Sequence, residues 1–226
     1  MSDAKIREKI CLFARSLFER GLTPGSSGNI SVRLPDGSYL TTPTNASLGF
    51  LDPARLSHID AAGNLLSGDK PTKEVPLHTA LYETRGEAQA VVHLHSTHSV
   101  AVSMLPEIDP AAVLPPMTAY YVMKLGHTAL VPYYRPGDAA VAGAIRGLAG
   151  RYASVLLANH GPVVAGESLD AAVYATEELE ETARLYLMLR GLNPRILSQS
   201  QVDDLVRHFN LTLPEPDHDP HHHDHG

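Results

Sequence analysis

The sequence predicts an α/β protein in which helices flank a central sheet that is mixed or largely antiparallel. Helical stripes of apolar residues alternate along the chain with short apolar runs of the kind found in buried strands. A hairpin pattern also occurs early in the chain. Because helices and strands alternate while a hairpin is present, we expect the helices to pack against the faces of such a sheet.

The first predicted element is an amphipathic helix. It starts after Ser2, and Gly21 is placed to end it. Between these two positions apolar residues recur at the spacing of one helical face, at Ile6, Ile10, Phe13 and Leu17.

A hairpin should follow this helix. Residues 23–29 are dense in turn formers, and residues 30–33 then alternate like a strand. Residues 39–42 return as the partner strand across the turn at residues 35–37. Further strands are predicted near residues 56–60, 88–95, 128–132, 153–158 and 162–165, and further helices over residues 74–84, 110–125 and 138–149.

The clearest later helix runs from Ser168, a good N-cap, to Gly191, and Pro194 lies just beyond. Its apolar residues recur every four positions, at Ala175, Leu179, Ala183 and Leu187. The length of 226 residues suits one large domain, which we expect to span residues 1–212.

The segment 213–226 is expected to be a disordered tail. It combines prolines and alternating acids with five histidines in its last nine residues, so it has nothing to bury. It could bind metal ions loosely, although a solvated tail without a role is the more ordinary interpretation.

Composition and charge exclude several functional classes. The formal net charge is −7, and four acids of the tail account for more than half of it. No basic stripe suggests nucleic acid. Cys11 is the only cysteine, which excludes an intrachain disulfide framework and a thiolate zinc site. The start lacks the profile of a signal peptide and no apolar run is long enough to span a membrane, so we expect a soluble cytoplasmic protein.

His93-Leu94-His95 is the most informative stretch of the chain. It follows the apolar run 88–92, so both histidines should lie at the end of a buried strand and point the same way. A second apolar run, residues 156–158, leads through Asn159 into His160. Three imidazoles around one ion with an open position form a catalytic zinc arrangement suited to Lewis-acid chemistry.

A lone histidine at a strand end is more often an ordinary packing or surface residue, and only the paired spacing strengthens the metal hypothesis. His78, among apolar residues of a predicted helix, and His98, just after the pair, are interpreted as ordinary packing or surface residues.

Two loops could bind an anion. Ser26-Ser27-Gly28-Asn29 offers small hydroxyls, a glycine and an amide side chain, which together suit phosphate. In residues 68–74, Thr72 and Lys73 precede a helix whose free amides and dipole would attract an anion. Each loop alone is weak evidence. Glu74 could serve only the helix dipole, or it could carry protons beside a metal and a phosphate.

These segments, in this order, resemble the class II aldolase/adducin family. The motifs are Ser27-Gly28-Asn29-Ile30-Ser31, Thr42-Pro43-Thr44, Lys70-Pro71-Thr72-Lys73-Glu74, His93-Leu94-His95-Ser96 and Asn159-His160-Gly161, and the match covers residues 5–190. The resemblance implies a three-layer α/β/α sandwich. It also implies one Zn²⁺ per subunit, or another divalent ion, held by His93, His95 and His160, with Glu74 as acid/base and possible fourth ligand.

The same resemblance implies phosphate contacts from Ser27, Gly28, Asn29, Thr44, Asn45, Thr72 and Lys73. Members of the family usually form cyclic homotetramers with sites at subunit interfaces, where a neighbour's tyrosine aids proton transfer. Tyr120 is the matching position in this chain.

The chain departs from the sugar-phosphate aldolases, which have two small hydroxyl residues before the glutamate, where this chain has Thr72-Lys73. Residues 68–71, 132–138 and 157–164 are instead similar to the branch that decarboxylates 3-oxo-tetronate 4-phosphates in four-carbon sugar-acid catabolism. The resemblance therefore implies zinc-dependent release of CO₂ through a metal-stabilised enediolate, which yields dihydroxyacetone phosphate. Lys73 or Arg135 could orient the substrate carboxylate in the ground state, although strong pairing with it would oppose the release of CO₂.

Other functions remain open because the same metal site serves several reactions. The enzyme alternatives are a fuculose- or ribulose-phosphate aldolase, a ribulose-phosphate 4-epimerase and a thioribulose-phosphate dehydratase. A non-catalytic binding module like the adducin head is a further alternative, although the presence of all three histidines and the glutamate argues against it.

Overall fold

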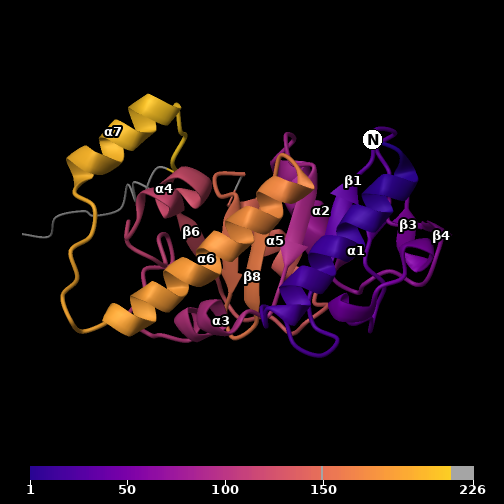
Figure 1. The fold of residues 1–226 in the computed structure, drawn as a ribbon, viewed down its shortest axis with the longest axis horizontal. Helices are drawn as coiled ribbons and strands as arrows, with labels where there is room; N and C mark the ends of the chain where they lie inside the picture. The colour runs from indigo at the N-terminus through magenta and orange to yellow at the C-terminus, as the bar shows by residue number, and fades with distance from the viewer. Residues whose placement is uncertain (149, 215–226) are drawn as a thin grey trace, which may run out of the picture.

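The computed structural model of the protein describes residues 1–148 and 150–214, and its centre is one eight-stranded sheet (Figure 1). The strand order is β4-β3-β2-β1-β5-β8-β7-β6. All neighbouring strands pair antiparallel except β6 and β7, which are parallel. The strands are β1 Asn29–Arg33, β2 Tyr39–Thr41, β3 Ser57–Ile59, β4 Leu65–Ser67, β5 Ala90–His93, β6 Thr128–Val131, β7 Ser154–Leu157 and β8 Gly161–Gly166.

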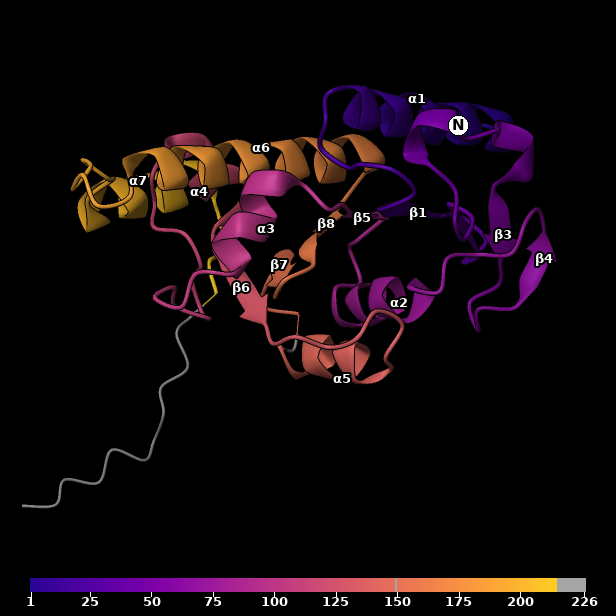
Figure 2. The same ribbon diagram turned by 90° about the horizontal axis from the view of Figure 1, so that it is seen from below.

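Helices cover both faces of the sheet, as Figure 2 shows: α1 and α6 lie on one side, and α2 and α5 lie on the other. The helices are α1 Asp3–Glu19, α2 Val75–Thr84, α3 Thr97–Ser103, α4 Ala119–Leu125, α5 Ala140–Gly147, α6 Leu169–Leu189 and α7 Gln199–Phe209, with short 3₁₀ turns at Leu48–Phe50 and Pro53–Arg55. The predicted α/β/α sandwich with a mixed, largely antiparallel sheet is therefore confirmed.

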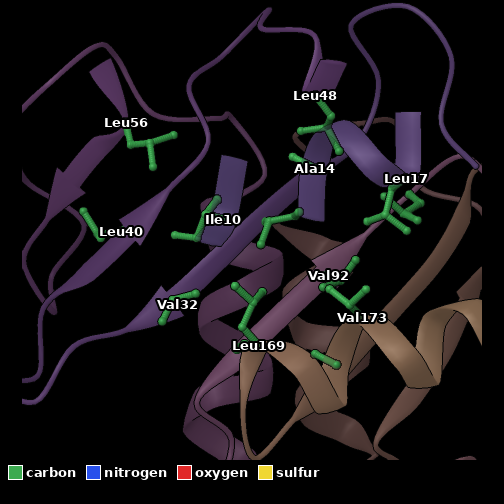
Figure 3. Packing of buried hydrophobic residues seen from close by; sticks show 14 of the residues in the cluster. Ile10, Ala14, Leu17, Val32, Leu40, Leu48, Leu56, Val92, Leu169 and Val173 are labelled. Atoms are coloured by element: carbon green, nitrogen blue, oxygen red, sulfur yellow. The ribbon is translucent and has the colours of Figure 1, made fainter. Parts of the chain in front are cut away.

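The core is divided between the two faces by the alternation of side chains along the central strands. On β5, Val92 packs with Ile10 and Leu17 of α1 and with Val173 of α6 (Figure 3). Its neighbour Val91 points to the other face and packs with α2 and α5. Because the side-chain period of a strand is two, His93 follows Val91 towards α2.

One predicted helix is wrong over most of its length. Residues 110–118 of the predicted helix 110–125 are not helical, and only α4 forms. Pro110, Pro115 and Pro116 lack the amide hydrogens that a helix needs. The segment instead follows the edge strand β6, where Leu130 N donates to Pro110 O at 2.8 Å and Val113 N donates to Thr128 O at 2.9 Å.

Three elements were not expected from the sequence: β4, α3 and α7. None of the helices in the described ranges, 1–148 and 150–214, has the length and apolarity that crossing a membrane requires. Of the predicted tail 213–226, the structure describes residues 213 and 214, which carry no secondary structure, and the rest lies outside the described residues.

Candidate metal centre

The three predicted imidazoles meet at one end of the sheet. His93 is the last residue of β5, His95 follows two residues later, and His160 lies in the turn between β7 and β8. The ring centroids of the three side chains are 4.7 to 5.1 Å apart. One nitrogen of each imidazole lies within 4.8 Å of the others, so the cluster could hold one metal ion.

The turn between β7 and β8 depends on two unusual backbone conformations. Asn159 has φ 59°, which is the left-handed region that asparagine tolerates better than most residues. Gly161 has φ 156°, and a Cβ at this position would lie 2.1 Å from the carbonyl oxygen of Leu94. A glycine is needed because the turn lies directly against the backbone between His93 and His95.

The hydrogen bonds around the imidazoles leave nitrogen lone pairs for an ion. His93 Nδ1 donates to the carbonyl oxygen of Pro162 at 2.8 Å, which directs the lone pair of its Nε2 into the cluster, 3.3 Å from His160 Nε2. His95 Nε2 is buried and has no hydrogen-bond partner among the described residues. Burial, followed by the neighbouring imidazoles, lowers the pKa of His95 and of His160 to about 4. The neutral rings of His95 and His160, with an orphaned buried nitrogen on His95, fit a divalent metal.

Glu74 lies between two of the imidazoles. Its Oε2 is 3.3 Å from His93 Nε2, and its Oε1 is 3.3 Å from His160 Nε2. Asn29 Nδ2 donates to Oε2 at 2.7 Å. Burial raises the pKa of Glu74, but the hydrogen bond and charge of His93, the Asn29 amide and His160 outweigh it and hold the pKa well below its usual range. The side chain is therefore a carboxylate, and it could ligate an ion or exchange protons beside one.

A polar pocket opens beside this cluster and contains all the residues that were predicted to bind phosphate. Two loops form its wall, because Thr44 N donates to Lys70 O at 2.9 Å and Thr72 N donates to Thr42 O at 3.3 Å. It is lined by Ser26, Ser27, Gly28, Asn29, Pro43, Thr44, Asn45, Thr72, Lys73, Glu74, His95, Pro136 and His160.

The start of α2 offers fewer free amides than the sequence suggested. The Glu74 amide donates to Thr72 Oγ1 at 3.2 Å, and Pro76 has no amide hydrogen. An anion in the polar pocket would therefore depend more on side chains such as Asn29 and Lys73 than on this helix terminus.

A second pocket lies on the other side of Glu74 and His160, towards α5. It shares Lys73 with the polar pocket, and Arg135 lines it as well. Asp138 is a further charged residue of its lining. The other walls are largely apolar and come from Pro76, Leu77, Pro132, Tyr134, Pro136, Val141, Leu157 and Ala158. The metal cluster therefore stands where a polar pocket and a more apolar one meet.

Two further residues need comment: Tyr120 stands apart from the cluster, and His78 differs from its sequence interpretation. Tyr120 is the second residue of α4 and is 61% exposed. It lines a surface hollow together with Tyr174 and lines neither of the two pockets at the cluster. His78, interpreted as ordinary packing, is buried and hydrogen-bonded to Asn29 and Ser31. In the sequence, only the four-residue step from Glu74 along one helix face connects His78 with the site, and this step does not show its contact with Asn29.

Comparison with known proteins identifies the family. Residues 8–187 match the model of the class II aldolase and adducin N-terminal domain. The chain belongs to the class II aldolase and adducin family. Within this family it is 51% identical over 189 residues to the 3-oxo-tetronate 4-phosphate decarboxylase of Cupriavidus necator. The aligned region covers 84% of this chain and 87% of that protein.

More distant members of the family carry another activity in their names. The L-fuculose phosphate aldolase of Methanocaldococcus jannaschii is 38% identical over 188 residues, which is 82% of this chain and 96% of that protein. Among solved structures, YgbL of Escherichia coli superposes with a TM-score of 0.88 at 49% identity. The superposition covers 90% of this chain and 98% of YgbL, which is described by the alternatives aldolase, epimerase or decarboxylase.

Proposed function

We propose that this protein is a metal-dependent carboxy-lyase that converts a 3-oxo-tetronate 4-phosphate into dihydroxyacetone phosphate and CO₂. The observation that carries the proposal is the convergence of His93, His95, His160 and Glu74 where the two pockets meet. Decarboxylation is preferred to aldol cleavage because the chain is 51% identical to a decarboxylase and 38% identical to an aldolase of the same family.

The three imidazoles would hold the metal, which we propose to be Zn²⁺, since neutral nitrogen ligands suit that ion. Glu74 is close enough to His93 and His160 to serve as a fourth ligand in the resting enzyme. When bound, the ion would supply Lewis-acid stabilisation of negative charge that develops on the substrate's oxygens.

The polar pocket would bind the phosphate at C4. Lys73 offers a positive charge, Asn29 an amide donor, and Ser27, Thr44 and Thr72 hydroxyl groups, so this pocket has the donors that a phosphate requires. With the phosphate there, the C2 and C3 oxygens would lie towards the imidazoles, and the C1 carboxylate would point to the second pocket.

The largely apolar walls of the second pocket favour loss of CO₂. Lys73 and Arg135 of this pocket would orient the carboxylate, while the apolar side chains of Leu77, Val141 and Leu157 offer it no further stabilisation and do not penalise neutral CO₂. The electrons of the C1–C2 bond pass towards the C3 oxygen as CO₂ leaves, and one proton must then reach C2. Glu74 is the carboxyl group that lines both pockets, and we assign it this proton delivery, for which the carboxylate first takes up a proton from water.

We also propose that the protein acts as a homotetramer in which Tyr120 of a neighbouring subunit assists proton transfer. In a single subunit this tyrosine is exposed and stands apart from the cluster, which is the placement that a residue acting in a neighbour's site requires.

The test is incubation of the zinc-loaded protein with both stereoisomers of 3-oxo-tetronate 4-phosphate, fuculose 1-phosphate and ribulose 5-phosphate. We expect equal amounts of CO₂ and dihydroxyacetone phosphate from one 3-oxo acid, and loss of both products after chelation with recovery when zinc is restored. Dihydroxyacetone phosphate released with an aldehyde and without CO₂ would assign the protein to the aldolases instead. Size-exclusion chromatography with light scattering tests the tetramer.

A further inference from the structure

One face of α2 and one face of β1 are joined by a continuous line of buried hydrogen bonds that ends at Glu74. Along α2, Glu74, His78 and Tyr82 follow one another at steps of four residues. Opposite them, Asn29 and Ser31 stand two residues apart on β1 and so point the same way. The two spacings interleave, so that each β1 side chain lies between two α2 side chains.

Every link of this line is a hydrogen bond. Tyr82 Oη is 2.8 Å from Ser31 Oγ, which is 2.6 Å from His78 Nδ1. His78 Nε2 bonds to Asn29 Oδ1, and Asn29 Nδ2 donates to Glu74 Oε2 at 2.7 Å. His78 is 3% exposed and touches neither pocket at the cluster, so it contacts no substrate.

The carboxylate at one end fixes the position of every proton in the line. Ionised Glu74 can only accept, so the Asn29 amide must turn its NH₂ towards Glu74 and its oxygen towards His78. That oxygen can only accept, so His78 must carry its proton on Nε2. The neutral ring then accepts at Nδ1 from the Ser31 hydroxyl, whose oxygen in turn accepts from Tyr82.

The surroundings of His78 are consistent with this order. Burial, followed by the charge of His93, lowers the pKa of His78 to about 3, so its ring is neutral at ordinary pH. Burial likewise raises the pKa of Tyr82, so its hydroxyl keeps the proton that it donates.

We propose that His78 is a positioning residue that sets the orientation of the Asn29 amide and, through it, the position of the Glu74 carboxylate; this rests on the proposed role of Glu74 in proton transfer. If the amide turned over, its oxygen would face the carboxylate and repel it. Asn29 also lines the polar pocket, so the same amide connects the phosphate site to the proton carrier.

The variants His78→Leu and His78→Gln separate this role from simple packing. Leucine fills the space but cannot donate to Asn29, whereas the glutamine amide can donate to Asn29 and accept from Ser31. We expect His78→Leu to lower kcat at least tenfold with KM changed less than threefold and with zinc content retained, because small displacements of catalytic groups are costly. His78→Gln should recover kcat to within about threefold of the wild type.

Ser154→Ala is the matched control for a lost buried hydrogen bond. Ser154 lies at the start of β7, at the opposite end of that strand from His160, and its hydroxyl joins another buried line through Thr128 to Tyr121. It should lower the melting temperature while leaving kcat unchanged. If His78→Leu behaves like this control, with wild-type kcat, His78 only supports packing and the proposal is wrong.

A second measurement depends on neither a variant nor turnover. Nitrogen-15 spectra of the histidine rings in the metal-free wild-type protein should show His78 protonated at Nε2 and unprotonated at Nδ1. The opposite tautomer would overturn the proposal. Because the spectrum is independent of activity, it distinguishes failure of this inference from failure of the proposed decarboxylase function.

Discussion

Gly161 is the position at which a single methyl group should destroy the metal centre. A Cβ built there lies 2.1 Å from the carbonyl oxygen of Leu94, 3.1 Å from its carbonyl carbon and 3.3 Å from Cα of His95. Carbon–oxygen contacts in proteins are normally about 3.3 Å or longer, so the two backbones must separate by about 1.2 Å. All three atoms belong to the backbone that carries two of the imidazoles, and no flexible side chain can absorb the displacement.

This displacement can be compared with the variation in metal–ligand distance that a bound ion allows. Metal–ligand distances are held to about ±0.2 Å, so a shift of about 1.2 Å between His160 and the His93–His95 segment exceeds the tolerance severalfold. We expect Gly161→Ala to lower zinc affinity by at least about a hundredfold, to lose turnover, and to lower the unfolding free energy by about 1–3 kcal/mol through overpacking.

The assay is a zinc titration against a chromophoric chelator, accompanied by denaturant unfolding of the metal-free protein. Gly143→Ala is the matched control, because Gly143 lies inside α5 and a Cβ there meets nothing within 4 Å. It should leave zinc affinity unchanged and raise the unfolding free energy by about 0.5–1 kcal/mol. Wild-type zinc affinity in Gly161→Ala would refute the steric reasoning.

Three further predictions follow from the site. His95→Ala should abolish both zinc retention and turnover, measured by metal analysis and product assay; an active, metal-free variant would exclude His95 as a ligand. Glu74→Gln should keep the metal but lose about 10²–10⁴ in kcat, and turnover within about threefold of the wild type would contradict its proton-carrying role. The metal-free protein should lose stability as pH falls from about 6.5 towards 4, because the folded pKa of His160 is about 4 and that of His78 about 3, so only the unfolded chain takes up protons in this range. Each such histidine contributes a slope of about 1.4 kcal/mol per pH unit, and an unfolding free energy that is constant from pH 7 to 4.5 would contradict this.

The elements that could be predicted from the sequence carry their own local signals. The helices α1 and α6 repeat apolar residues at helical spacing, and the central strands are short apolar runs bounded by turn residues. The helix predicted over residues 110–125 is absent over residues 110–118, because the three prolines of that segment outweigh its apolar pattern. Those prolines favour an extended segment along β6.

The elements that were missed differ in what could have revealed them. The helix α7 begins with a capping box, in which Ser198 and Gln201 bond to each other's backbone amides, and this signal is visible in the sequence. The amides of His98 and Ser99 at the start of α3 bond to Glu180 of α6, some eighty residues later. No local pattern could show that partner. The strand β4 is exposed along its whole length, so it lacks the alternation by which strands are recognised.

At the site, each motif was visible in the sequence but the link between motifs was not. The histidines and Glu74 could be proposed because their residue types suggest a ligand set. His78 could not, because a histidine among leucines on a helix has the pattern of an ordinary core residue. Its partner Asn29 is 49 residues away and is brought to it only by the packing of α2 on β1.

The strand β5 is held on both sides by antiparallel neighbours, with Asn29 opposite His93 on β1 and Val163 opposite His93 on β8. A slip of one residue in this strand would send His93 into the layer of α1 and α6 and present an aliphatic side chain to Glu74. Insertions should therefore be tolerated in the outer hairpins of the molecule, whereas a single added or deleted residue within β5 would erase the catalytic centre while leaving the number of hydrogen bonds in the sheet almost unchanged.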